Sequence, residues 1–235
     1  RIQAVENGVS RDALYTYLTF GQKLAADGTL QDDAGFALTL YGGIEGERGI
    51  RMTHRAGRLD VLGTVNVASL DNSGTLALYS VDETGYAATA EEFVNAPGST
   101  LETGFVADGS VTAVQAQNAS LSGAWAMRAM PDFYASDQII RPYEPVTVTG
   151  GRTGSFDSVV LAANASPTLT FSLLDANPSA PSIMVSRAQD AYSRYAGNAG
   201  AARLGRALPG IGRQAQGDMR NLLAALDWSD SDGHE

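Results

Sequence analysis

The side chain best suited to acid–base chemistry is the imidazole of His54, because the only other histidine, His234, lies next to the C-terminus. Nucleophilic catalysis would also need a serine or cysteine beside that base and a third group to orient it. The chain has no cysteine and no Gly-x-Ser-x-Gly elbow, and Arg51 and Arg55 near His54 would disfavour its protonation. We therefore expect His54 to lie at the surface and the chain to contain no catalytic residue.

Adjacent acids and glycine-rich segments are the next candidates. The pairs Asp32-Asp33 and Glu91-Glu92 could serve glycoside cleavage or calcium binding, but adjacent acids in a turn are more often solvated surface residues. The segment 150–157 has the glycines and the aspartate of one calcium-binding nonapeptide, yet it occurs once rather than in tandem. We expect this segment to form a turn, and we expect no metal and no cofactor.

The charge and composition narrow the class of protein. The 26 acidic and 16 basic residues give a net charge of −10, which disfavours binding to nucleic acid. With 44% hydrophobic and 18% charged residues the chain can bury a substantial core. The absence of cysteine suits a polypeptide that crosses a membrane unfolded, because a premature disulfide would block transit. Since the chain starts at Arg1 without a leader, we expect an excised part of a longer protein.

Most of the chain has the periodicity of strands. Between residues 13 and 185, short apolar runs alternate with Thr, Ser or Ala and are separated by turn residues. Such runs occupy residues 14–20, 36–41, 59–67, 75–79, 110–114, 146–149, 158–161 and 169–173. This pattern predicts an all-β fold, in which only residues 88–94 could form a helical turn.

A degenerate Gly-x-Leu repeat bears on the kind of β fold. It occurs as Gly28-Thr29-Leu30, Gly57-Arg58-Leu59 and Gly74-Thr75-Leu76, with the related Ser99-Thr100-Leu101. Repeats of this kind favour a solenoid, in which each coil stacks on its neighbours. A β-sandwich with Greek-key links would give a similar pattern, so periodicity alone leaves both open.

The character of the sequence changes after Val185. Ser186 and Gln189 have the spacing of a capping box, which predicts a helix that Pro209-Gly210 would end, and Asp218 could cap a second helix. The side chains expected on the apolar helical faces include Tyr192, Tyr195, Leu222, Leu223 and Leu226. Six arginines between residues 187 and 220 make this segment basic, so it could lie on anionic lipid or serve as a linker.

Aromatic residues are concentrated just before this change. The side chains that we expect to form a stable core are Trp125, Phe133, Tyr134, Tyr143 and Phe156. Each buried ring contributes on the order of a few kcal/mol through its apolar area. We therefore predict an aromatic cap that folds first and templates the strands before it.

Three segments together resemble a known family. Residues 143–159 (YEPVTVTGGRTGSFDSV), 71–78 (DNSGTLAL) and 191–226 resemble the last rungs and the linker of a bacterial autotransporter passenger, in the same order. The resemblance implies a right-handed parallel β-helix with a C-terminal α-helical linker. It divides the chain into upstream rungs or the foot of another module (1–58), a C-terminal β-helix with an autochaperone-like cap (59–185), a helical linker (186–228) and a frayed tail (229–235).

The same resemblance implies a role in type V secretion. The chain would be a surface-exposed stalk and folding nucleus that presents an upstream module, without enzymatic activity of its own. Its expected partners are its own outer-membrane β-barrel, absent from this chain, the barrel-assembly machinery and a second copy met through the exposed linker. It would be found on the bacterial surface or secreted, as virulence-associated passengers are. The alternatives are a fragment of a passenger enzyme, either a serine protease or a carbohydrate-active β-helix, and an adhesin.

Overall fold

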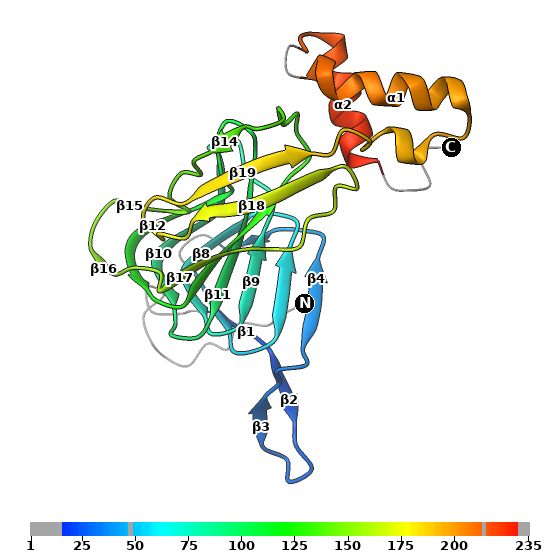
Figure 1. Cartoon of the computed structure of the whole chain (residues 1–235). Coiled ribbons are helices and arrows are strands. Elements are labelled where there is room, and N and C mark those ends of the chain that lie inside the picture. Colours follow the sequence, from blue (N-terminus) through cyan, green and yellow to red (C-terminus); the bar gives the residue numbers. More distant parts are fainter. Residues whose placement is uncertain (1–15, 47–48, 213–214, 230–235) are drawn as a thin grey trace. The chain divides into compact units, whose positions relative to one another are not determined.

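A computed structural model describes residues 16–46, 49–212 and 215–229 (Figure 1). Strands dominate, and the two α-helices are C-terminal: α1 (Ala199–Gly212) and α2 (Asp218–Trp228). The prediction of a mostly β chain with C-terminal helices is confirmed at this level. The chain divides into two compact units, with residues up to 103, 112–126 and 144–159 in unit 1 and residues 104–111, 127–143 and those from 160 on in unit 2.

Two large sheets contain most of the strands. Sheet 1 is ordered β1 (Thr16–Phe20), β6 (Ile50–His54), β8 (Val65–Asn72), β10 (Tyr86–Asn95), β12 (Ala113–Leu121) and β15 (Val146–Val148), with β5 (Ile44–Glu45) beside β8 and β16 (Arg152–Gly154) beside β12. Sheet 2 is ordered β17 (Ser158–Leu161), β13 (Ala124–Ala129), β11 (Thr100–Phe105), β9 (Thr75–Leu78), β7 (Arg58–Val61) and β4 (Ala37–Leu40).

The chain alternates between these sheets. From β6 to β13, even-numbered strands belong to sheet 1 and odd-numbered strands to sheet 2. A strand therefore pairs in parallel with the strand two elements further along, as β8 does with β10 and β7 with β9. A Greek-key sandwich is built from antiparallel neighbours. The parallel pairing therefore argues against the sandwich that the periodicity left open.

The Gly-x-Leu repeat is in register in sheet 2. Leu59 pairs with Leu76, Leu76 pairs with Leu101, and all three side chains are fully buried. The first copy of the repeat differs, because it forms the antiparallel hairpin of β2 (Gln22–Leu24) and β3 (Leu30–Asp32). There Leu30 is 66% exposed, so this copy marks a turn and adds no buried leucine.

Sheet 1 has a matching apolar column. Met52, Leu70 and Phe93 pair across β6, β8 and β10, and each side chain is fully buried. Residues 88–94, where the sequence allowed a helical turn, lie within β10. Within this segment Ala88 and Phe93 are buried, whereas the adjacent Glu91 and Glu92 are exposed.

Unit 2 contains a smaller antiparallel sheet and the helices. Its strands are ordered β14 (Ile139–Ile140), β19 (Ser182–Arg187) and β18 (Leu169–Asp175), and the short helix η3 (Ser193–Tyr195) precedes α1. Edge-to-face contacts join the rings of Phe105, Tyr134 and Phe171, whose centroids are 5.0–6.3 Å apart. This aromatic cluster lies beside β18 and includes rings that are distant in sequence.

The helical segment starts later than its sequence predicts. Ser186 is part of β19 and pairs with Thr170, so the predicted capping box is wrong. Helix α1 also continues past Pro209 to Gly212, so Pro209-Gly210 does not end it. The prediction of a second helix is confirmed, but Asp218 is its first residue rather than its cap, because the N-cap position is Gly217. Within the described ranges, neither helix is both long enough and apolar enough to cross a membrane.

Candidate functional site

The segment 143–159 contains the strands at one end of both sheets. Strands β15 and β16 both pair with β12, at Val114–Ala116 and Ala119–Leu121, and β17 lies beside β13. We call β15, β16 and β17 the terminal strand set. Strands β15 and β16 therefore extend sheet 1 beyond β12, and β17 extends sheet 2 beyond β13.

The glycines of this segment allow a close approach of backbones. A Cβ atom on Gly150 would lie 2.7 Å from the carbonyl oxygen of Gln117, and one on Gly154 would lie 2.2 Å from that of Leu121. Gly154 also has a φ of +69°, which favours glycine. The Gly151 N–H donates to Asn118 Oδ1 at 2.9 Å. These positions therefore fix β16 and the turn before it against β12.

Asp157 fixes the other end of the segment. Its Oδ2 accepts hydrogen bonds from Gly123 N–H at 2.6 Å and from the Ser122 hydroxyl at 2.9 Å. Its own N–H donates to the Gly123 carbonyl at 2.7 Å. A carboxylate that accepts bonds from a backbone N–H and a hydroxyl is a strong local constraint. Asp157 thereby ties the turn before β17 to the turn before β13.

Phe156 brings the segment into the core of unit 1. Its ring is buried and lies 6.3 Å from that of Trp125, centroid to centroid. Trp125 is fully buried, and its indole N–H donates to Thr103 Oγ1 at 2.8 Å. The indole therefore contributes apolar area without leaving its donor unpaired.

The other predicted cap residues lie in unit 2. Phe133 and Tyr134 are buried, and the Tyr134 hydroxyl is 2.8 Å from the Met130 carbonyl oxygen. The prediction that Tyr143 belongs to the aromatic core is wrong, because its side chain is 64% exposed. Three aromatic residues of unit 2, namely Phe105, Phe171 and Trp228, pack around Tyr134 instead. Their distance from Tyr134 in sequence hid them from a search for local aromatic density.

His54 lies in a buried polar ladder, so the prediction of a surface histidine is wrong. Its Nδ1 is 3.0 Å from Asn72 Oδ1, the Asn72 amide donates to Asn95 Oδ1 at 2.8 Å, and the Asn95 amide donates to the Ser122 carbonyl at 2.7 Å. The first three residues end β6, β8 and β10 in register. The ladder therefore pairs polar groups at stacked strand ends, while His54 Nε2 is buried without a hydrogen-bond partner among the described residues.

The ladder predicts a pH dependence of stability. Burial lowers the pKa of His54 below its ordinary 6.5, and the hydrogen bond with Asn72 offsets only part of this effect. The unfolded chain therefore binds a proton near pH 6.5 that the folded chain does not, and the free energy of unfolding should fall as the pH drops through that value. Urea unfolding at about pH 7.5 and about pH 5.5 measures the change. An equal pH dependence in His54→Gln would contradict this assignment.

The C-terminal helix is tied to unit 2 by a buried ion pair. Arg187, at the end of β19, and Asp227, in α2, have fully buried side chains, and Arg187 Nε donates to Asp227 Oδ1 at 3.1 Å. The same carboxylate accepts from the hydroxyls of Tyr192 at 2.8 Å and Thr168 at 2.5 Å. Arg187 Nη1 donates to Ser136 Oγ at 3.0 Å. Both buried charges are thus paired with each other and with further hydrogen-bond partners, which offsets the cost of removing them from water.

The predicted linker side chains divide between this packing and the surface. Tyr192 and Leu223 are buried in a cluster with Phe133 and Leu208, and Tyr192 additionally reaches Asp227. The Tyr195 hydroxyl donates to the Pro167 carbonyl at 3.3 Å. Leu226 is partly buried against the cluster, whereas Leu222 is 49% exposed. Most of these residues therefore hold the helices onto unit 2.

The acidic residues considered for chemistry lie on the surface of unit 1. Glu91 and Glu92 are in β10 and share a cleft of about 200 Å³ with Asp71 and Arg51. Burial raises the pKa of Asp71, and Glu92 accepts a hydrogen bond from the Asn118 amide at 2.7 Å. No aromatic residue lines the cleft. In the described ranges, no three His, Asp or Glu side chains are placed to hold a metal ion.

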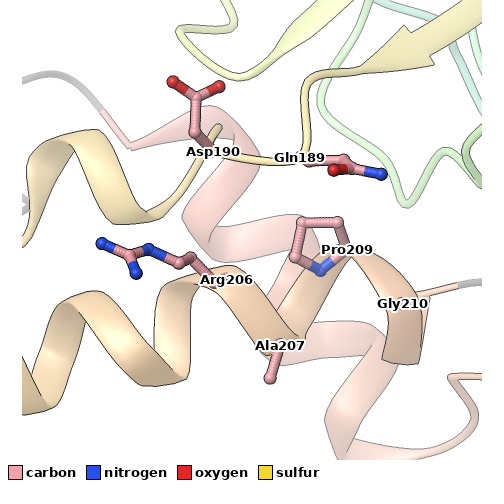
Figure 2. A pocket seen from close by; sticks show the side chains of 6 residues that line it. All are labelled: Gln189, Asp190, Arg206, Ala207, Pro209 and Gly210. Carbon is pink, nitrogen blue, oxygen red and sulfur yellow. The ribbon is translucent and has the colours of Figure 1, made fainter.

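A hollow of about 470 Å³ lies between the end of β19 and α1 (Figure 2). Its polar side chains are Gln189, Asp190 and Arg206. Figure 2 shows that their functional groups point in different directions and do not converge on one position. Asp190 also pairs with Arg194 at 2.8 Å. The hollow therefore lacks the convergent acid, base or nucleophile that a reaction requires.

No family model, curated protein or solved structure matches the chain.

Proposed function

We propose that this chain is the C-terminal part of a bacterial autotransporter passenger and works as a surface stalk and folding nucleus. In this proposal, the two parallel sheets are faces of one right-handed β-helix, and each coil contributes one strand to each sheet. The support is the alternation of strands between the sheets from β6 to β13, together with parallel pairing two elements apart. A coil that returns to the same sheet after each turn produces this order.

The terminal strand set carries the proposal. Gly150, Gly154 and Asp157 of the family-like segment each make a contact with the preceding strands that another residue type would weaken. The segment that resembles the autochaperone ending is thus the one that completes the edge of both sheets. Its resemblance in sequence and its position in the structure support the same role.

The physical role of such an end is to lower the barrier for the coils before it. Parallel strand pairing is nonlocal, so the first pair must overcome loop-closure entropy before its contacts form. Once an edge exists, each added coil forms only nearest-neighbour contacts. A passenger that emerges C-terminal end first could therefore fold onto this end, and its folding would favour outward transport.

The helical segment completes the proposal. Helices α1 and α2 would lead toward the passenger's own outer-membrane barrel, with the barrel-assembly machinery as a transient partner. The ion pair between Arg187 and Asp227 would keep this segment docked on unit 2 at the cell surface. We assign the chain no catalytic role.

A carbohydrate-active enzyme is the second candidate, because a cleft with three acids lies on unit 1. Sugar-binding clefts usually combine acids with aromatic rings that stack on the sugar, and this cleft has none in its lining. The absence of aromatic rings from the lining of this cleft therefore favours the stalk over the enzyme. An adhesin, the third candidate, would also need an exposed face that binds its ligand.

A secretion assay tests the proposed function. The parent polypeptide would be expressed with Trp125→Ala and Phe156→Ala, and its surface-exposed amount measured by protease accessibility on intact cells. We expect the double variant to accumulate inside the envelope, because its nucleus lacks both rings. Tyr143→Ala is the matched control, since that ring is 64% exposed. Surface amounts equal to wild type in the double variant, or no membrane-inserting region encoded after Glu235, would contradict the proposal.

A further inference from the structure

Helix α1 has an apolar stripe that unit 2 does not cover. Its buried residues are Gly205, Leu208 and Gly212, which define the face packed on unit 2. Leu204 is 62% exposed and Ile211 is 42% exposed. These two side chains are two helical turns apart and therefore lie on a common face, which adjoins the packed face at Leu208. Exposed leucine and isoleucine at this spacing form an amphipathic helix surface.

The charged residues of α1 itself are all positive. Helix α1 contains Arg203 and Arg206 and no acidic residue, and both arginines are exposed. Within the described part of the chain, neither guanidinium has an ion-pair partner, whereas Arg194 is paired with Asp190. Arg203 therefore flanks the stripe, and Arg206 lies on the opposite, polar side of the helix, where Asp190 lines the same hollow.

A small apolar hollow continues the stripe on the side of Leu204. It has a volume of about 170 Å³, and its lining includes Tyr195, Ala201, Leu208 and Leu226. An acyl chain or an apolar side chain could enter it. The uncovered apolar surface therefore extends from α1 to the groove between α1, η3 and α2.

We propose that this face of α1 docks on a bilayer that contains anionic lipid. Leu204 and Ile211 would enter the boundary between headgroups and acyl chains, and Arg203 would meet anionic headgroups. The local complementarity carries the argument, because the whole chain has a net charge of −10 and would otherwise be repelled. A second copy fits less well, since two large side chains fall far short of the roughly 800 Å² per partner that a stable interface buries.

Vesicle binding by the full chain tests the docking site independently of the secretion proposal. Vesicles of phosphatidylcholine with and without phosphatidylglycerol would be sedimented with the protein, and the partition coefficient determined. We expect binding to the anionic vesicles to fall about fivefold in Arg203→Gln, and at least tenfold in Leu204→Asn with Ile211→Asn. Added salt should weaken wild-type binding in the same direction.

The matched control is Leu24→Asn, because Leu24 is 70% exposed in β2 of unit 1. It should bind like the wild type. Circular dichroism would confirm that the variants remain folded, and all substituted side chains are at the surface. Wild-type binding that does not depend on phosphatidylglycerol, an equal loss in Leu24→Asn, or concentration-dependent dimerisation lost in Leu204→Asn without vesicle binding would overturn the proposal.

Discussion

Asp227→Ala is expected to destabilise unit 2 by about 3–5 kcal/mol, because it leaves the Arg187 guanidinium buried without a counterion. The substitution also removes the acceptor of the Tyr192 and Thr168 hydroxyls, and each unsatisfied buried group adds to the loss. Since Asp227 is on α2, the helix should detach first. Urea unfolding and hydrogen exchange at the α2 amides measure the two effects.

The matched control is Asp190→Ala. Asp190 also forms an ion pair with an arginine, Arg194, but both side chains are largely exposed. Exposed pairs contribute little to stability because solvent screens them and their side chains lose entropy. We expect no clear change in the unfolding midpoint. A similar small effect from Asp227→Ala would show that the buried pair does not hold α2 on unit 2.

Trp125→Ala is expected to destabilise unit 1 by about 3–5 kcal/mol, the usual result of removing a large buried ring. The cavity would lie beside Phe156 and leave the Thr103 hydroxyl without its donor. If the terminal strand set nucleates folding, most of this loss should appear as slower refolding, because the affected contacts already exist in the transition state. Stopped-flow refolding and unfolding of the full chain separate the two rates.

Tyr143→Ala controls for the loss of an aromatic residue in the same segment. Its ring is 64% exposed, so both rates should remain close to those of the wild type. A Trp125→Ala variant that refolds at the wild-type rate and only unfolds faster would assign the ring to ordinary core packing. That result would remove the kinetic part of the proposed function while leaving the fold unchanged.

The strands of the two large sheets were the part of the structure most accessible from sequence. Leu59, Leu76 and Leu101 follow turn residues in a repeat, and the structure places them in one buried column. Such a repeat can be recognised in the sequence because each strand packs in the same environment as the equivalent strand of the preceding repeat. Periodicity did not predict the parallel direction of the pairing, since alternation is the same for parallel and antiparallel strands that bury one face; only the family resemblance implied it.

The errors arose where distant residues decide the structure. Ser186 fits a capping box locally, but pairing with Thr170 keeps it in a strand. His54 seemed a surface residue beside Arg55, yet its environment is set by Asn72 on the next strand of sheet 1. Arg187 is one of the six arginines from which the sequence predicts a basic segment. In the structure it is instead buried and paired with Asp227. Local patterns cannot show contacts of this kind.

The most direct test of the central claim is the order in which strands become protected during refolding of the full chain, measured by pulsed hydrogen exchange and mass spectrometry. If the C-terminal end is the folding nucleus, amides of β12, β15 and β16 should be protected before those of β1 and β6. The contrary result is protection of β1 and β6 first, or of all these strands together. Either would mean that the coils do not form on a C-terminal template.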